Sequence, residues 1–205
     1  MKEYGGKMNC SAKTKLELVD LNGIKLYIDK SDKEKRVLLA STFHGDEDCL
    51  DVIFHYLREG NKDIAISLIP IVNKYGIDNS IRENRQGDNI NCSFNHPKCK
   101  KTMPLTVESI SILDNLSLIK YCARDGYSSL HVDKNTDQHY SHIWMQETPS
   151  QFILDDLNVK DYNLCYNSLE DYLWHEGIPL TACLEYSKSR EGRIEFTNKF
   201  LDYIL

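Results

Sequence analysis

The hydrophobic pattern near the start of the sequence predicts a β-hairpin. Apolar and polar residues alternate over 15–21 and again over 24–28, and Asn22 and Gly23 stand between the two runs. An Asn-Gly pair between alternating runs is the strongest short-range hairpin signal, because both central positions of such a turn need positive φ. The two segments are therefore predicted to pair as antiparallel strands.

Beyond this hairpin, segments with strand patterns alternate with segments of helical spacing. Apolar, β-branched runs predict strands over 36–42, 63–72, 128–132 and 180–186. Apolar residues at helical spacing predict helices from Leu50 to Gly60, from Thr106 to Tyr121, near Ser168 to His175, and from Ile194 onward. Such alternation is typical of an α/β fold. We expect one domain over 1–205, with a mixed, mostly parallel twisted sheet flanked by helices.

Two stretches show no sustained period. The segment 75–103 is polar and rich in Asn, Gly and Asp, and the segment from 133 to Gln151 follows a predicted strand. Both are predicted to be irregular. Long irregular segments within compact domains often carry function, so candidate chemistry is expected there or beside them.

Charge and composition exclude several classes of protein. The 205 residues include 25 basic and 31 acidic side chains, a net charge of -6 with no basic stripe, so no nucleic-acid partner is expected. Residues 1–7 lack the apolar run of a signal peptide, and no apolar stretch reaches membrane length. We expect a cytoplasmic protein without a membrane partner. Seven scattered cysteines with no Cys-x-x-Cys pair indicate reduced thiols.

A histidine and a carboxylate stand three residues apart where a predicted strand leads into a helix. His44 and Glu47 belong to the tetrapeptide His-Gly-Asp-Glu. Both side chains are ligands that zinc accepts, and strand ends are where open α/β sheets build their sites. The alternative is a solvated loop in which Glu47 is only a first-turn helix charge.

Two more residues on predicted strands could complete a catalytic zinc site. His131 lies at the end of another predicted strand and could be a third ligand, which would leave the fourth position to water. Glu185 lies inside an apolar strand, where burial would raise its pKa and suit it to act as a general base. The alternatives are a structural histidine and a carboxylate that faces solvent.

The segment 82–94, Arg-Glu-Asn-Arg-Gln-Gly-Asp-Asn-Ile-Asn-Cys-Ser-Phe, resembles the pattern R-x-N-x-x-G-x-D-L-N-R-N-F of zinc carboxypeptidases of the carboxypeptidase A type. The order of His44, Glu47, His131 and Glu185 around this segment also resembles that family. The short chain and the tetrapeptide are most similar to the bacterial murein peptide amidase branch. The resemblance implies one zinc ion held by His44, Glu47 and His131.

The resemblance also implies a reaction and a substrate. Glu185 and the zinc ion would deprotonate a water molecule that attacks an amide carbonyl, Arg82 would help to hold the oxyanion, and Asn91 with the next residue would contact substrate. The substrate would be a short peptide or a peptidoglycan-derived peptide. Two alternatives stay open: an N-acyl amino acid hydrolase of the desuccinylase and aspartoacylase type, and a degenerate module that binds peptide or metal without catalysis.

Two positions depart from the family pattern. Cys92 stands where the family has a carboxylate-binding arginine, so recognition of a terminal carboxylate is lost unless another arginine takes this role, with Arg85, Arg124 and Arg190 as candidates. Asn89 stands where the family has the aspartate that orients the first zinc histidine, which predicts weaker metal binding. The family's active-site tyrosine cannot be placed from sequence; the candidates are Tyr162, Tyr166 and Tyr172. His139 and His142 are interpreted as incidental histidines of a surface loop.

Overall fold

The computed structural model describes residues 15–98, 103–145, 151–162 and 167–205. In this part of the chain, strands and helices alternate along one eight-stranded sheet in the order β1-β2-β4-β3-β5-β8-β6-β7. The strands are β1 Leu16–Leu21, β2 Ile24–Asp29, β3 Lys35–Ser41, β4 Ile64–Ile69, β5 Gly126–Asp133, β6 Tyr140–Met145, β7 Val159–Tyr162 and β8 Leu180–Ser187. The helices are α1 Leu50–Glu59, α2 Lys74–Asn79, α3 Val107–Leu113, α4 Leu116–Cys122, α5 Gln151–Asp156, α6 Leu169–His175 and α7 Arg193–Asp202, with a 3-10 turn at Ile90–Cys92.

The pairing confirms the predicted fold class. β1 and β2 form the predicted hairpin, in register from Leu21 and Ile24 at the turn. The central strands β4, β3, β5 and β8 are parallel neighbours, while β2 and β6 join them antiparallel. The sheet is therefore mixed and largely parallel, with its parallel strands in the middle.

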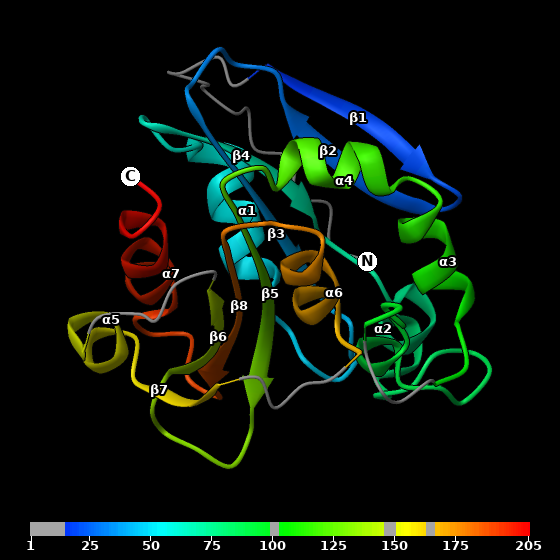
Figure 1. Cartoon of the computed structure of the whole chain (residues 1–205). Coiled ribbons are helices and arrows are strands. Elements are labelled where there is room, and N and C mark those ends of the chain that lie inside the picture. The colour runs from blue at the N-terminus through cyan, green and yellow to red at the C-terminus, as the bar shows by residue number, and fades with distance from the viewer. Residues whose placement is uncertain (1–14, 99–102, 146–150, 163–166) are drawn as a thin grey trace, which may run out of the picture.

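Helices cover the two faces of the sheet (Figure 1), and an apolar layer lies between the helices and the sheet on each face. One layer joins the alternate residues of β5 and β8, such as Leu130 and Leu184, to α1 and α7. The other places α3, α4 and α6 against the opposite face, where Tyr127 of β5 lies with Leu173 of α6. Because side chains alternate along a strand, His131 and Glu185 lie on the α6 face.

Three predicted segments differ from the structure. The segment 75–103 is not wholly irregular, because α2 and the 3-10 turn lie within it and residues 99–102 are outside the description. The helix predicted from Thr106 to Tyr121 is two helices, α3 and α4, separated at Asp114 and Asn115. The loop predicted after β5 contains the strand β6, which pairs with β8.

Candidate metal centre and active site

The loop that follows β3 carries the first two candidate ligands. Thr42 adopts a left-handed conformation (φ 55°), uncommon for a β-branched residue, and its hydroxyl donates to the carbonyl of Pro70 at 2.9 Å. This turn directs His44 toward the end of β5. Glu47 follows before α1, and both side chains are buried.

A buried asparagine fixes this loop to the neighbouring segment. The side-chain amide of Asn73, just before α2, donates to the carbonyls of Phe43, Arg82 and Glu83 at 3.1–3.3 Å. Its side-chain oxygen accepts from the backbone N–H of Gly76 at 2.7 Å. The Asn73 side chain thus fixes the backbone next to His44 and also the backbone of Arg82.

Gly45 lies against the backbone of Gly76, and a Cβ atom at position 45 would overlap that backbone. We expect Gly45→Ala to lower the free energy of unfolding by at least about 1–3 kcal/mol, because neither backbone can give way without moving the His44 loop. Thermal unfolding followed by circular dichroism measures the change. Lys74→Ala, on the exposed side of α2, is the control and should change stability by less than about 0.5 kcal/mol. An equal effect of the two variants would contradict the crowding argument.

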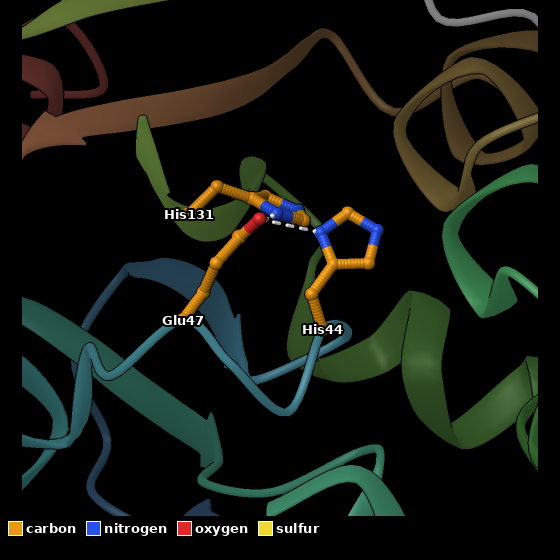
Figure 2. A group of neighbouring side chains, drawn as sticks. All are labelled: His44, Glu47 and His131. Carbon is orange, nitrogen blue, oxygen red and sulfur yellow. Dashed lines mark hydrogen bonds and ion pairs between the residues drawn. The ribbon is translucent and has the colours of Figure 1, made fainter. Parts of the chain in front are cut away.

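The ligand atoms of His44, Glu47 and His131 all lie within 4.8 Å of one another (Figure 2). The Nδ1 atoms of the two histidines each lie 2.8 Å from a carboxylate oxygen of Glu47, His44 from Oε1 and His131 from Oε2. The His131 ring stacks on Phe43 with centroids 5.8 Å apart. The structure therefore brings together the three ligands expected from sequence.

The hydrogen bonds around His44 fit a metal ion. Its Nε2 faces the side-chain oxygen of Asn89 at 3.0 Å, an oxygen that already accepts from the N–H of Asn91. Its Nδ1 faces the Glu47 carboxylate, so both ring nitrogens point at acceptors, whereas a neutral imidazole has one N–H. A cation bound by Nδ1 and by Glu47 gives both ring nitrogens a suitable partner, because Nε2–H then donates to Asn89. The Nε2 atom of His131 is buried and has no hydrogen-bond partner within the described residues.

The two histidines keep the carboxyl group of Glu47 ionised. Burial raises the pKa of Glu47, but the charge of His131 and the hydrogen bonds from both histidines outweigh it and hold that pKa well below its ordinary value. Burial lowers the pKa of His131, yet the adjacent Glu47 carboxylate raises it to about 9. Glu47 is therefore available as an anionic ligand.

Asn89 precedes the 3-10 turn, and its side-chain oxygen contacts Nε2 of His44, the contact that the resemblance implies for an aspartate. We predict that Asn89→Asp strengthens zinc binding by roughly 10- to 100-fold, because an anionic acceptor on Nε2–H makes His44 a stronger ligand. Titration against a competing chelator measures the affinity. Asn79→Asp, exposed on α2, makes the same charge change away from the site and should leave the affinity unchanged. Equal affinities of Asn89→Asp and the unmodified protein would refute the role of residue 89 in tuning His44 as a ligand.

A pocket of about 420 Å³ opens beside this cluster, and its wall includes Glu47, Arg82, Tyr140 and Glu185. Glu185 pairs in register with His131 on β5 and with Tyr140 on β6. The thiol of Cys183 donates to Glu185 at 3.5 Å. Arg82 is half-exposed and its guanidinium lies 2.7 Å from Glu47. The two residues expected to carry catalysis thus face the same pocket as a candidate ligand.

The segment 82–94 is arranged around Asn84, which is buried. Its side-chain oxygen accepts from the N–H groups of Gln86 and Asp88, and its amide donates to Glu108 at the start of α3. The turn closes with Gly87 at φ 84°. These contacts explain the Asn and Gly of the motif as scaffold residues, a role that the sequence did not reveal.

The residues expected to contact substrate lie in different parts of the structure. Asn91 is buried and Cys92 half-buried, and the side-chain oxygen of Asn91 has no partner in the described structure. Arg124 precedes β5 and pairs with Asp125, at the end of the strand opposite His131, so its proposed role as the replacement arginine is wrong. Arg190 lies in a second pocket that adjoins the first through Val132 and Lys134.

The tyrosine that lines the pocket is not one of the three tyrosines expected from sequence. Tyr140 lines the pocket and donates to Asp133 at 2.9 Å; burial, with the nearby Glu185 charge, raises its pKa. Tyr172 instead packs against His96. The side chain of Tyr162 and all of Tyr166 lie outside the described residues. His142 lies on β6 and His139 just before it, so the interpretation of a surface loop is wrong for His142.

Comparison with solved structures identifies the fold. The structure is similar to a protein described as a metallopeptidase from Shewanella baltica OS155 (TM-score 0.77, 23% identity, 92% of this chain and 85% of the other). It is also similar to murein-tripeptide amidase from Escherichia coli O157 (TM-score 0.60, 14% identity, 88% and 84%). The chain has a metallopeptidase-like fold. An aspartoacylase family protein from Mesorhizobium loti shares this metallopeptidase-like fold (TM-score 0.66, 12% identity, 92% and 70%). No family model and no curated protein matches the sequence.

In the part of the chain that the structure describes, no helix is long and apolar enough to cross a membrane.

Proposed function

We propose that the chain is a metal-dependent hydrolase that cleaves an amide bond of a short peptide or peptidoglycan-derived peptide, with one zinc ion as its cofactor. The observation that carries this proposal is the convergence of His44, Glu47 and His131 on one point at the wall of the pocket that also contains Glu185. Two histidines and one carboxylate with open space beside them are the ligand set of catalytic zinc sites.

The residues take distinct parts in the reaction. A bound zinc ion lowers the pKa of water and polarises a carbonyl. Glu185 accepts a proton from the attacking water as the water oxygen forms its bond to the amide carbon. Arg82 stabilises the negative charge that develops on the carbonyl oxygen, an electrostatic contribution that acts only in the transition state. Glu185 then passes the proton to the leaving nitrogen as the carbon–nitrogen bond breaks.

Hydrolysis of defined peptides tests this function. The zinc-loaded protein is expected to cleave γ-D-glutamyl-diaminopimelate peptides, to lose this activity on treatment with a chelator, and to regain it when zinc is restored. Product amines are measured by chromatography. A fully loaded protein that cleaves none of these peptides would favour the binding module without catalysis.

The second candidate is an N-acyl amino acid hydrolase, favoured by the adjoining pocket. This pocket, also about 420 Å³, is lined by Lys134, Lys188, Arg190 and Arg193 together with Asp48. Its cations suit a substrate with a carboxylate in the acyl group. N-succinyl and N-acetyl amino acids in the same assay separate the two candidates, because only the second candidate prefers them to peptides.

A further inference from the structure

The second pocket lies across the end of β5 from the candidate site. Val132 belongs to the apolar layer under α1 and α7, whereas its neighbour His131 is directed to the α6 face, because side chains alternate along a strand. Val132 and Lys134 line both pockets, so the two cavities adjoin at the carboxyl end of β5. A ligand that crosses this strand end can therefore occupy both cavities.

The wall of the second pocket carries an excess of positive charge. Its lining residues are Asp48, Val132, Lys134, Lys188, Arg190 and Arg193. Three of the four cations extend into solvent: the side chains of Lys134, Lys188 and Arg190 are 54%, 67% and 65% exposed. Arg193, by contrast, is buried. The exposed cations are therefore the groups that a ligand can meet.

The buried arginine fixes the loop between β8 and α7. The Arg193 guanidinium donates to the backbone carbonyls of Ser187 and Ser189 at 3.1 and 3.0 Å. It also donates to the carbonyl of Asp48 at 2.7 Å, which joins this loop to the segment before α1. These contacts use the donors of Arg193 within the protein, so its role is to build the pocket wall.

A histidine ring holds the same loop from the other side. Nδ1 of His139 accepts from the N–H of Ser187 at 3.1 Å, and Nε2 donates to the carbonyl of Glu191 at 2.9 Å. Lys188 and Arg190 lie between these two anchored residues. Both cations are thus presented by a backbone that is already ordered, which lowers the entropy lost when a ligand binds.

The three exposed cations are paired only with acids that are themselves partly or largely exposed. These pairs are Lys134 with Asp46, Lys188 with Asp137, and Arg190 with Asp48. Ion pairs between solvent-exposed groups contribute little to stability, so an entering anion can replace the acids. A carboxylate suits this exchange, because a guanidinium group can bind both of its oxygens.

We infer that the second pocket binds a free carboxylate in the acyl half of the substrate, with Lys188 and Arg190 as its main contacts. The inference rests on the proposed function, because it places the scissile carbonyl at the cluster of candidate metal ligands. It applies to peptide hydrolysis as well as to N-acyl amino acids. The carboxylate belongs either to a glutamyl residue linked through its γ-carboxyl group or to a dicarboxylic acyl group.

Both sources place the carboxylate close to the bond that is cut. Its carbon lies three bonds from the scissile carbonyl carbon in a succinyl group and four bonds in a γ-glutamyl group, about 4–5 Å when extended. The two cavities share Val132 and Lys134, so such a group can enter the second while the amide remains in the first. The acyl half then lies toward α1 and α7.

Binding of the free acyl halves to the zinc-loaded protein tests the inference without requiring turnover. The probes form two pairs that differ by one carboxylate: glutamate, as both enantiomers, against 4-aminobutanoate, and succinate against propanoate. Affinities are measured by calorimetry. We expect the dicarboxylate of at least one pair to bind at least about 10-fold more tightly, because a charge-assisted hydrogen bond contributes at least that factor. The pair that shows the preference identifies the source of the carboxylate.

The double variant Lys188→Gln with Arg190→Gln should reduce this preference to less than about threefold and change monocarboxylate binding by less than about twofold. The matched control is Lys62→Gln with Lys199→Gln. It removes two charges before β4, at the opposite end of the sheet, and in the last turn of α7, so it should keep the preference.

Asp48→Asn is expected to have the opposite effect. It removes the acid that competes for Arg190, while the amide oxygen can still accept from the N–H of Leu50. The affinity for the preferred dicarboxylate should rise by about two- to fivefold. A lower affinity would contradict the displacement of this acid by the ligand.

Equal binding of monocarboxylates and dicarboxylates, or a preference that survives in the double variant, overturns the inference. Loss of the preference in the control variant as well would also overturn it. Active hydrolysis without a dicarboxylate preference refutes the role of the second pocket alone. A preference that depends on Lys188 and Arg190, without hydrolysis of any amide, refutes the proposed reaction and retains this binding site.

Discussion

Glu185→Gln is expected to slow amide hydrolysis by at least ~100-fold in kcat while the protein keeps its metal. Glutamine preserves the volume and the hydrogen bond from Cys183, but it cannot take a proton from water, and positioned acid–base groups contribute about 10²–10⁴-fold. Single-turnover kinetics on the metal-loaded variant measure the chemical step.

The position of Glu185 supports this magnitude. It lies in the pocket wall beside Glu47, yet it is outside the cluster whose atoms converge on the candidate metal position. Metal content should therefore match that of the unmodified protein. Glu195→Gln, exposed on α7, is the control for removal of one charge. Activity that survives Glu185→Gln would remove Glu185 from the mechanism, and loss of zinc would assign it to the metal shell.

His131→Ala is expected to weaken zinc binding by well over ~100-fold and to abolish activity with it. Loss of a hydrogen-bond partner of a metal ligand alone costs roughly 10- to 100-fold in affinity, and loss of a direct ligand costs more. His131 provides one of the three converging ligand atoms, and the described cluster contains no further histidine that could replace it. Metal analysis after dialysis against a weak chelator measures retention.

The matched control for this loss is His139→Ala. His139 precedes β6 and contacts the backbone of Glu191 and Ser187, away from the cluster. That variant should retain one equivalent of zinc. If His131→Ala also retains it, the ion is bound elsewhere and the proposed centre is wrong.

The parts of the fold predicted from sequence are those with local signals. The Asn22-Gly23 turn and the alternation around it specify the hairpin, and the apolar spacing from Leu50 to Gly60 specifies α1. The pair His44 and Glu47 could be recognised because both candidate ligands lie in one loop. For His131 the sequence offered only a position at a strand end and the resemblance, since the parallel pairing of β3 and β5 is what brings it to that loop.

Other features depend on tertiary contacts that no local pattern encodes. The short helix α2 is stabilised by the capping side chain of Asn73 rather than by apolar spacing. β6 carries Tyr140, His142 and Trp144 on the face shared with Glu185, so it lacks a clear apolar alternation. Glu170 reads as an ordinary helix acid in sequence, and only packing against the sheet shows that it is buried.

The position of β8 within the sheet determines when the site can form during synthesis. β8 follows the other seven strands in the sequence but lies between β5 and β6, so these two strands have open edges until residues 180–187 are made. Such non-local pairing is slow to form, and unpaired edges favour aggregation. The nascent chain therefore exposes both edges while His44 and His131 already exist. Glu185 must therefore be synthesised before the sheet can close and the pocket that it lines can be complete.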